Sequence, residues 1–104
     1  MKFYKSLYIG QTIKKPYKVK WKLRYGALQP NIYVITLAKG SDQLEIYHSI
    51  FLRQKYYRKH PPYIIGICKG YEEALDTVIG IVQAAIEKSG SPDIKKFLFS
   101  QVNH

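Results

Sequence analysis

Polar and apolar residues alternate with a period of two along much of residues 1–69, and this pattern predicts β-strands. In KVKWKLRY, residues 18–25, a cation occupies every even position and a large apolar side chain every odd one. Successive side chains of a strand point to opposite faces, so this alternation is typical of a strand with one solvent-exposed face. Residues 2–9 and 43–52 show the same period. We therefore predict strands over 2–9, 17–25 and 43–52.

Two other segments are apolar at consecutive positions. They are IYVITLA, residues 32–38, and YIIGICK, residues 63–69. A strand that is apolar on both faces belongs in the middle of a covered sheet. Residues 26–31 and KGSD, residues 39–42, have the composition of turns. Because such short connections join antiparallel neighbours, we expect antiparallel pairing throughout the sheet.

The period changes to that of a helix after Gly70. A helix of about five turns is predicted to end at Gly90, and Gly80 in its middle is interpreted as a point of close approach to a strand. Ser91-Pro92-Asp93 predicts the N-terminus of a second helix, reaching about Ser100. The first helix would bury Tyr71, Leu75, Val78, Ile79, Val82, Ala85 and Ile86, and the second Ile94, Phe97 and Leu98.

These elements predict an α+β domain that spans residues 1–104. It would contain an antiparallel sheet of four to five strands, from residues 1–69, with one long and one short C-terminal helix packed on one face. A chain of 104 residues is long enough to bury a core of its own as a single domain.

The positive charge is concentrated at the N-terminal end. The net charge is +10; residues 1–41 contribute nine basic and no acidic residues, or +9, and residues 42–104 eight basic and seven acidic, or +1. Such asymmetry produces a surface field that attracts anions.

The predicted sheet would leave one face open beside the helices. If Val19, Trp21 and Leu23 face the helices, the cations between them lie on the open face. The same parity turns Tyr4, Tyr8, Tyr47 and Phe51 outward. Cations beside aromatic rings are the components of a site for single-stranded RNA or DNA. A second basic stretch, RQKYYRKH at residues 53–60, would contact phosphates. The predicted nucleic-acid-binding residues are Lys18, Lys20, Lys22, Arg24, Tyr47, Phe51, Arg53, Lys55, Arg58 and Lys59.

Three alternatives stay open. The cations of residues 18–24 can serve solubility alone by keeping a strand from pairing with other chains. A homodimer can bury the apolar strand 32–38 and have no nucleic-acid role. A small ribonuclease can use His60 as a proton shuttle.

The sequence contains none of the common motifs for phosphate binding, nucleophilic catalysis or metal binding. No phosphate-binding glycine pattern, nucleophile elbow or paired Cys/His spacing occurs, so we expect no cofactor and no metal. The single cysteine, Cys68, lies in an apolar run and is expected to be buried, as in a protein of the reducing cytoplasm. No apolar run approaches the roughly 18 residues of a membrane span, and we expect no membrane partner.

Overall fold

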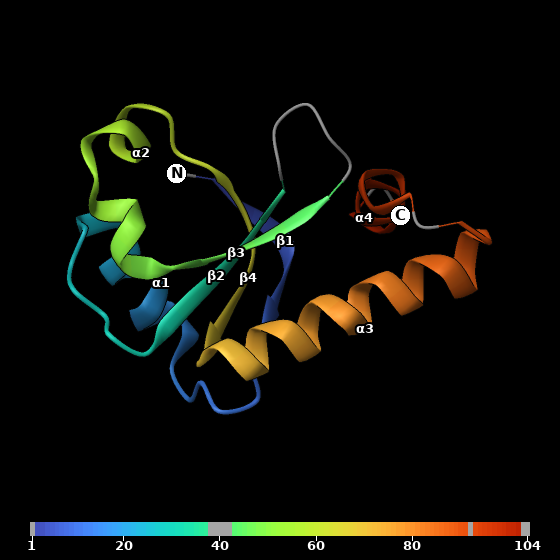
Figure 1. Ribbon diagram of the computed structural model, residues 1–104, viewed down its shortest axis with the longest axis horizontal. Helices are drawn as coiled ribbons and strands as arrows, with labels where there is room; N and C mark the ends of the chain where they lie inside the picture. The colour runs from blue at the N-terminus through green and yellow to red at the C-terminus, as the bar shows by residue number, and fades with distance from the viewer. Residues whose placement is uncertain (1, 38–42, 92, 103–104) are drawn as a thin grey trace.

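A computed structural model of the protein describes residues 2–37, 43–91 and 93–102 (Figure 1). Four strands, four α-helices and one 3₁₀ helix occur within these ranges. In chain order they are β1 (Lys2–Ile9), α1 (Pro16–Tyr25), β2 (Ile32–Leu37), β3 (Leu44–His48), η1 (the 3₁₀ helix, Ser49–Arg53), α2 (Lys55–Lys59), β4 (Tyr63–Lys69), α3 (Tyr71–Ser89) and α4 (Ile94–Val102).

The four strands form a mixed sheet in the order β1-β4-β2-β3. β2 pairs antiparallel with both β3 and β4, whereas β1 pairs parallel with β4. The α+β class is therefore confirmed, and the prediction of a purely antiparallel sheet is wrong. The parallel pair joins the first and last strands of the chain, which no hairpin connects, so short turns do not dictate its direction.

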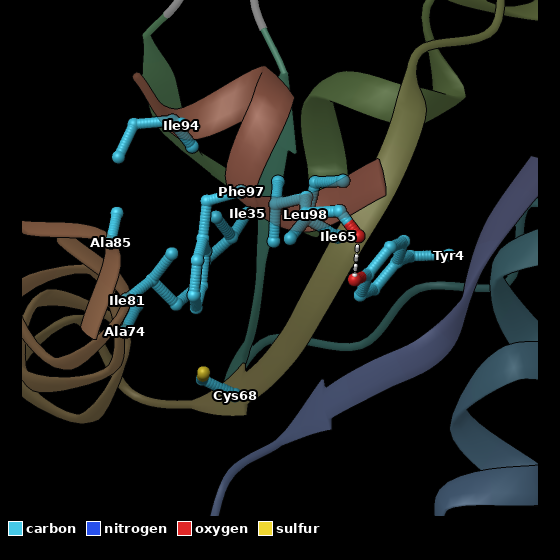
Figure 2. Close-up of a cluster of buried hydrophobic side chains, with 10 residues drawn as sticks. All are labelled: Tyr4, Ile35, Ile65, Cys68, Ala74, Ile81, Ala85, Ile94, Phe97 and Leu98. Atoms are coloured by element: carbon cyan, nitrogen blue, oxygen red, sulfur yellow. Dashed lines mark hydrogen bonds between the residues drawn. The ribbon is translucent and has the colours of Figure 1, made fainter. Parts of the chain in front are cut away.

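α3 and α4 cover one face of the sheet and form what we call the first core (Figure 1). Ile35 of β2 and Ile65 of β4 are fully buried there beneath both helices. Tyr4 of β1 enters the same core, and its hydroxyl donates a hydrogen bond to the backbone carbonyl of Leu98 at 2.5 Å (Figure 2). Its ring is 2% exposed, so the predicted outward orientation of Tyr4 is wrong.

The opposite face of the sheet is also covered, by α1, η1 and α2. Val34, Ile64 and Ile67 of the central strands pack there with Leu23 of α1 and Leu52 of η1, forming the second core. The prediction that one face of the sheet is open, with helices on the other face alone, is therefore wrong for the described residues. The prediction that β2 and β4 are buried central strands is confirmed, because each lies between two neighbours and below helices on both sides.

Residues 16–25 form helix α1, so the strand predicted over residues 17–25 is wrong. Pro16 stands in the first turn, where its fixed φ suits a helix and its missing N–H costs no hydrogen bond. Gly26 ends the helix at a φ of +75°, and its N–H bonds to the carbonyl of Leu23. Val19 and Leu23, four residues apart, both face the second core. A period of two also repeats every four residues, so the alternation fits a helix with a narrow buried side.

β3 ends at His48, earlier than the predicted strand over residues 43–52. The Nδ1 atom of His48 accepts a hydrogen bond from the N–H of Ile50 at 3.1 Å, and Nε2 lies 2.6 Å from the carbonyl oxygen of Pro30. Since Nδ1 is the acceptor, Nε2 carries the hydrogen and donates it to that carbonyl. The contact with Ile50 caps η1, so Phe51 lies on a 3₁₀ helix and not on a strand.

The C-terminal helices match the predicted elements, with different contacts. Gly90 ends α3 in the left-handed region, and Ile94, Phe97 and Leu98 of α4 are buried, both as predicted. Asp93, not Ser91, caps α4, since its Oδ1 accepts from the N–H of Lys96 at 3.2 Å. The predicted turn at residues 39–42, which includes Gly40, and the predicted role of Pro92 lie outside the described residues.

The buried side of α3 is narrower than predicted. Ala74, Ile81 and Ala85 form its buried positions, and Val78 and Val82 pack partly against the first core. The interpretation of Gly80 as a close approach is wrong, since no atom lies within 4 Å of where its Cβ would stand. Four of the residues predicted to be buried by this helix are exposed instead: Tyr71, Leu75, Ile79 and Ile86.

The hydrogen bond from Tyr4 to Leu98 joins the first strand to the last helix, and its removal tests this packing. Tyr4→Phe keeps the ring and should lower the free energy of unfolding by about 1 kcal/mol, as for a typical buried hydrogen bond. Tyr8→Phe is the control, because the described residues show no hydrogen bond from the Tyr8 hydroxyl. Urea denaturation measures both, and equal losses in the two variants would contradict the assigned contact.

Candidate nucleic-acid interface

The outer surface of α1 carries a row of aromatic side chains that we call the aromatic ridge. Tyr17, Trp21 and Tyr25 are spaced four residues apart and are 59%, 56% and 70% exposed. The rings of Trp21 and Tyr25 stack, with centroids 5.2 Å apart and planes inclined by 20°. The prediction that Trp21 faces the core is therefore wrong. Exposed and stacked, these rings offer flat apolar faces to a ligand.

The four predicted cations of α1 stand in two rows on either side of this ridge. At 100° per residue, Lys18 and Lys22 share one flank, and Lys20 and Arg24 the other. Lys20 Nζ lies 5.1 Å and Arg24 Cζ 5.0 Å from the centre of the Phe3 ring. Each row borders a shallow groove along the ridge. We call the ridge and its two rows the basic-aromatic face.

Helix stability does not account for the whole charge pattern of α1. Lys22 and Arg24 suit the negative C-terminal end of the helix dipole, but Lys18 lies near the positive end. Each flank also places like charges four residues apart, which costs about 0.2–0.5 kcal/mol per pair. α1 itself contains no acidic residue to offset them. The pattern therefore favours a role for the cations at the surface.

The second basic stretch, residues 53–60, contacts the end of α1 through one residue. Arg58 of α2 lies against the backbone of Gly26, where an added Cβ would stand 2.4 Å from its Nη1. Arg58 and Arg24 line one crevice, together with Tyr57 and Pro61. The two predicted basic clusters therefore meet at this point.

The other predicted residues of this stretch are exposed and more scattered. Arg53 ends η1, and Lys55 and Lys59 lie at the two ends of α2. Phe51 of η1 is 44% exposed. None of these four lines the crevice shared by Arg24 and Arg58. They remain accessible to a ligand that extends beyond α1.

Tyr47 does not belong to an open aromatic surface. Its ring packs against the second core and lies 5.9 Å from that of Tyr57, at an inclination of 53°. Its hydroxyl donates a hydrogen bond to Glu45 Oε2 at 2.8 Å. This bond, with a smaller contribution from burial, raises the pKa of Tyr47 to about 12. The prediction that Tyr47 points away from the first core is correct, but α2 covers that side of the sheet.

A second hollow, which we call the tyrosine crevice, lies between α2 and the ends of β2, β3 and β4. It has a volume of about 520 Å³. His60 borders it, with its ring 5.0 Å from that of Tyr56. Sequence reasoning assigned no binding role to most of its side chains, because they come from three separate segments. Those used below are Glu45, Tyr47, Tyr56, Tyr57, His60 and Tyr63.

One acidic residue near the start of α3, Glu73, has a structural role. Glu73 accepts hydrogen bonds from the N–H of Lys69 at 2.9 Å and from the hydroxyl of Thr12 at 2.7 Å. Burial alone would raise the pKa of Glu73, but these hydrogen bonds outweigh it and lower the pKa. Gly10 leaves the necessary space, since a Cβ there would stand 1.6 Å from Glu73 Oε1. This contact ties the connection after β1 to the end of β4.

Metal and thiol chemistry find no support in the described part of the chain. The residues within it include no group of three or more His, Cys, Asp or Glu side chains placed to hold a metal ion. Cys68 is fully buried, as predicted, and burial raises the pKa of its thiol. A raised thiol pKa makes the nucleophilic thiolate scarce at neutral pH.

The contact between Tyr47 and Glu45 predicts a specific titration. Because the pKa of Tyr47 is raised from 10.0 to about 12, its stabilising contribution is complete below pH about 10 and is lost as the pH rises through 12. Glu45→Gln should bring this pKa down toward 10, since it removes the carboxylate that favours the protonated phenol. NMR of ¹³Cζ-labelled tyrosine measures the shift. Tyr4 and Tyr8, whose pKa values are raised chiefly by burial, should not change, and an unaltered Tyr47 titration would refute the assignment.

No protein-family model, curated protein or solved structure matches this chain. None of the described helices combines the length and apolar character needed to cross a membrane. The case for a function therefore rests on the geometry of the basic-aromatic face and the crevices beside it.

Proposed function

We propose that this protein is a non-enzymatic module that binds single-stranded nucleic acid through the basic-aromatic face of α1. The observation that carries the proposal is the aromatic ridge lying between two rows of cations. Bases of a single strand stack on exposed rings, while cations contact the phosphates. The bases of a duplex are already stacked on each other, so this arrangement suits an unpaired strand.

The composition of the face favours a polyanion over a protein partner. Trp, Tyr and Arg are common in protein interfaces, but Lys is depleted from them. The ten residues of α1 include three lysines and one arginine in addition to the ridge, with no acid. A partner that carries a charge at regular intervals, as a nucleic acid does, matches two parallel rows of cations.

Arg58 extends the proposed interface past the end of α1. Its guanidinium group suits phosphate, because its planar fork donates two hydrogen bonds at once. The shared crevice places Arg58 near Arg24, the last cation of its row. Exposed residues of η1 and α2 would contact a longer strand. They are Phe51, Arg53, Lys55 and Lys59.

Binding should depend on salt in proportion to the number of phosphates contacted. For four cations on a single strand, log K should fall with log salt at a slope of about −2.8, or about −0.7 per contact. Lys18→Gln with Lys22→Gln should reduce the slope by about 1.4, and glutamine preserves helix propensity. Fluorescence anisotropy of a labelled mixed-sequence RNA or DNA oligonucleotide measures the slope, and quenching of Trp21, the only tryptophan, reports stacking.

The matched control removes two cations from the opposite side of the molecule. Lys88→Gln with Lys96→Gln causes the same loss of charge, on α3 and α4, and should leave the slope unchanged. Equal effects of the two pairs would show attraction by net charge alone, and no binding at low salt would refute the proposal. RNA recovered intact after incubation argues against the ribonuclease alternative centred on His60.

Self-association is a second candidate, supported by the exposed apolar side chains of α3. Tyr71, Leu75, Ile79 and Ile86 are 52%, 41%, 46% and 45% exposed. The homodimer first predicted through residues 32–38 does not fit, because β2 is paired and covered on both faces. Two copies could therefore pack these exposed apolar side chains of α3 against each other and leave both basic-aromatic faces free.

This candidate predicts a dimer that responds little to salt. In sedimentation velocity at several concentrations, Ile79→Glu should abolish the dimer, because it places a charge at the centre of the apolar stripe. Gln83→Glu adds the same charge at an exposed position one turn away and should have a smaller effect. A protein that sediments as a monomer at all concentrations would exclude self-association through α3.

A further inference from the structure

The tyrosine crevice continues from the proposed strand-binding surface. Tyr57 and Pro61 line both this crevice and the one that holds Arg24 and Arg58. A strand whose phosphates reach the two arginines would therefore have its next unit at the mouth of the tyrosine crevice. The inference below rests on the proposed function and concerns the sequence preference of the same site.

The crevice has the size and lining of a site for one planar ring system. Its volume of about 520 Å³ lies within the range of small-molecule sites, about 300–1,000 Å³. Tyr56 and Tyr57 meet at right angles, with ring centroids 5.2 Å apart, so they present one ring face and one ring edge. Tyr56 is 61% exposed and can close over a bound ring. An unstacked base of a single strand fits such a site.

Glu45 is out of place on a surface made only to attract phosphates. Asp42 and Glu45 are the only acidic residues before Glu72. Glu45 lines the tyrosine crevice, where its charge would repel a phosphate. It does hold the hydroxyl of Tyr47, but through Oε2 alone. The described residues donate no hydrogen bond to Oε1, and Oε2 keeps a second lone pair.

We propose that the tyrosine crevice receives one base of the bound strand and that Glu45 selects guanine. The Watson–Crick edge of guanine presents two adjacent donors, N1–H and the N2 amino group, which match the two oxygens of a carboxylate. Uracil presents a single N–H between two carbonyl oxygens, which a carboxylate repels. Tyr56 and Tyr57 supply the stacking surface, and Tyr47 fixes the orientation of the carboxylate.

The experiment compares oligouridine strands that differ at one central nucleotide. With uridine, guanosine or inosine at that position, the guanosine strand should bind about tenfold more tightly than oligouridine, as for a bidentate base contact. Inosine lacks only the 2-amino group and should lose most of this gain. Glu45→Gln should reduce the preference for guanosine to less than about twofold, because an amide offers one acceptor. Anisotropy at constant salt measures all three affinities.

Two controls separate this inference from the proposed function. Glu87→Gln removes the same charge from α3 and should leave the preference intact. Lys18→Gln with Lys22→Gln should weaken all strands equally and keep the ratio of guanosine to uridine. Salt-dependent binding with no preference among the three strands would overturn the role of the crevice and leave the proposed function standing. The absence of binding by any strand would overturn both.

Discussion

Two central strands that are apolar on both faces impose the main constraint on this fold. Val34, Ile35, Ile64, Ile65 and Ile67 are all fully buried; Ile35 and Ile65 lie in the first core, and Val34, Ile64 and Ile67 in the second. Leaving one such side chain in water costs about 1.5–3 kcal/mol. Helices must therefore cover both faces, and α3 with α4 can cover only one. Because α1 is needed on the other, its polar residues and its remaining aromatic residues must face solvent.

The parts of the fold that could be predicted are those whose local pattern has a single interpretation. A strand apolar at consecutive positions must be central, so β2 and β4 were predicted correctly. α1 was not, because its period of two also places Val19 and Leu23 on one side of a helix. The signals that distinguish the two were Pro16 before the segment and Gly26 after it. The parallel direction of β1 has no local signal, since its partner lies far along the chain.

The residue types of the candidate site could be predicted from the sequence better than their arrangement in space. Lysine and arginine stay at the surface in either a strand or a helix, so three of the four cations of α1 are exposed and Lys20 is half-buried. The prediction placed them in a single row, whereas the helix divides them into two. Trp21 was assigned to the core because residues 17–25 were predicted to form a strand, although its spacing from Tyr17 and Tyr25 is that of a helix face. The tyrosine crevice depends on tertiary contacts between α2 and three strand ends, which no local pattern encodes.

The two rows of cations are not equivalent, and the difference gives the face a direction. Phe3 lies beneath Lys20 and Arg24, and a cation–π contact contributes about 0.5–1 kcal/mol at such a surface. It offsets the repulsion between the two charges and limits their motion, so less entropy would be lost in the proposed binding to a phosphate. Lys18 and Lys22 have no such support among the described contacts. The ordered row is also the one that leads to Arg58 and, through Tyr57, to the tyrosine crevice. A strand bound along this flank, as proposed above, would therefore be directed toward the tyrosine crevice and Glu45.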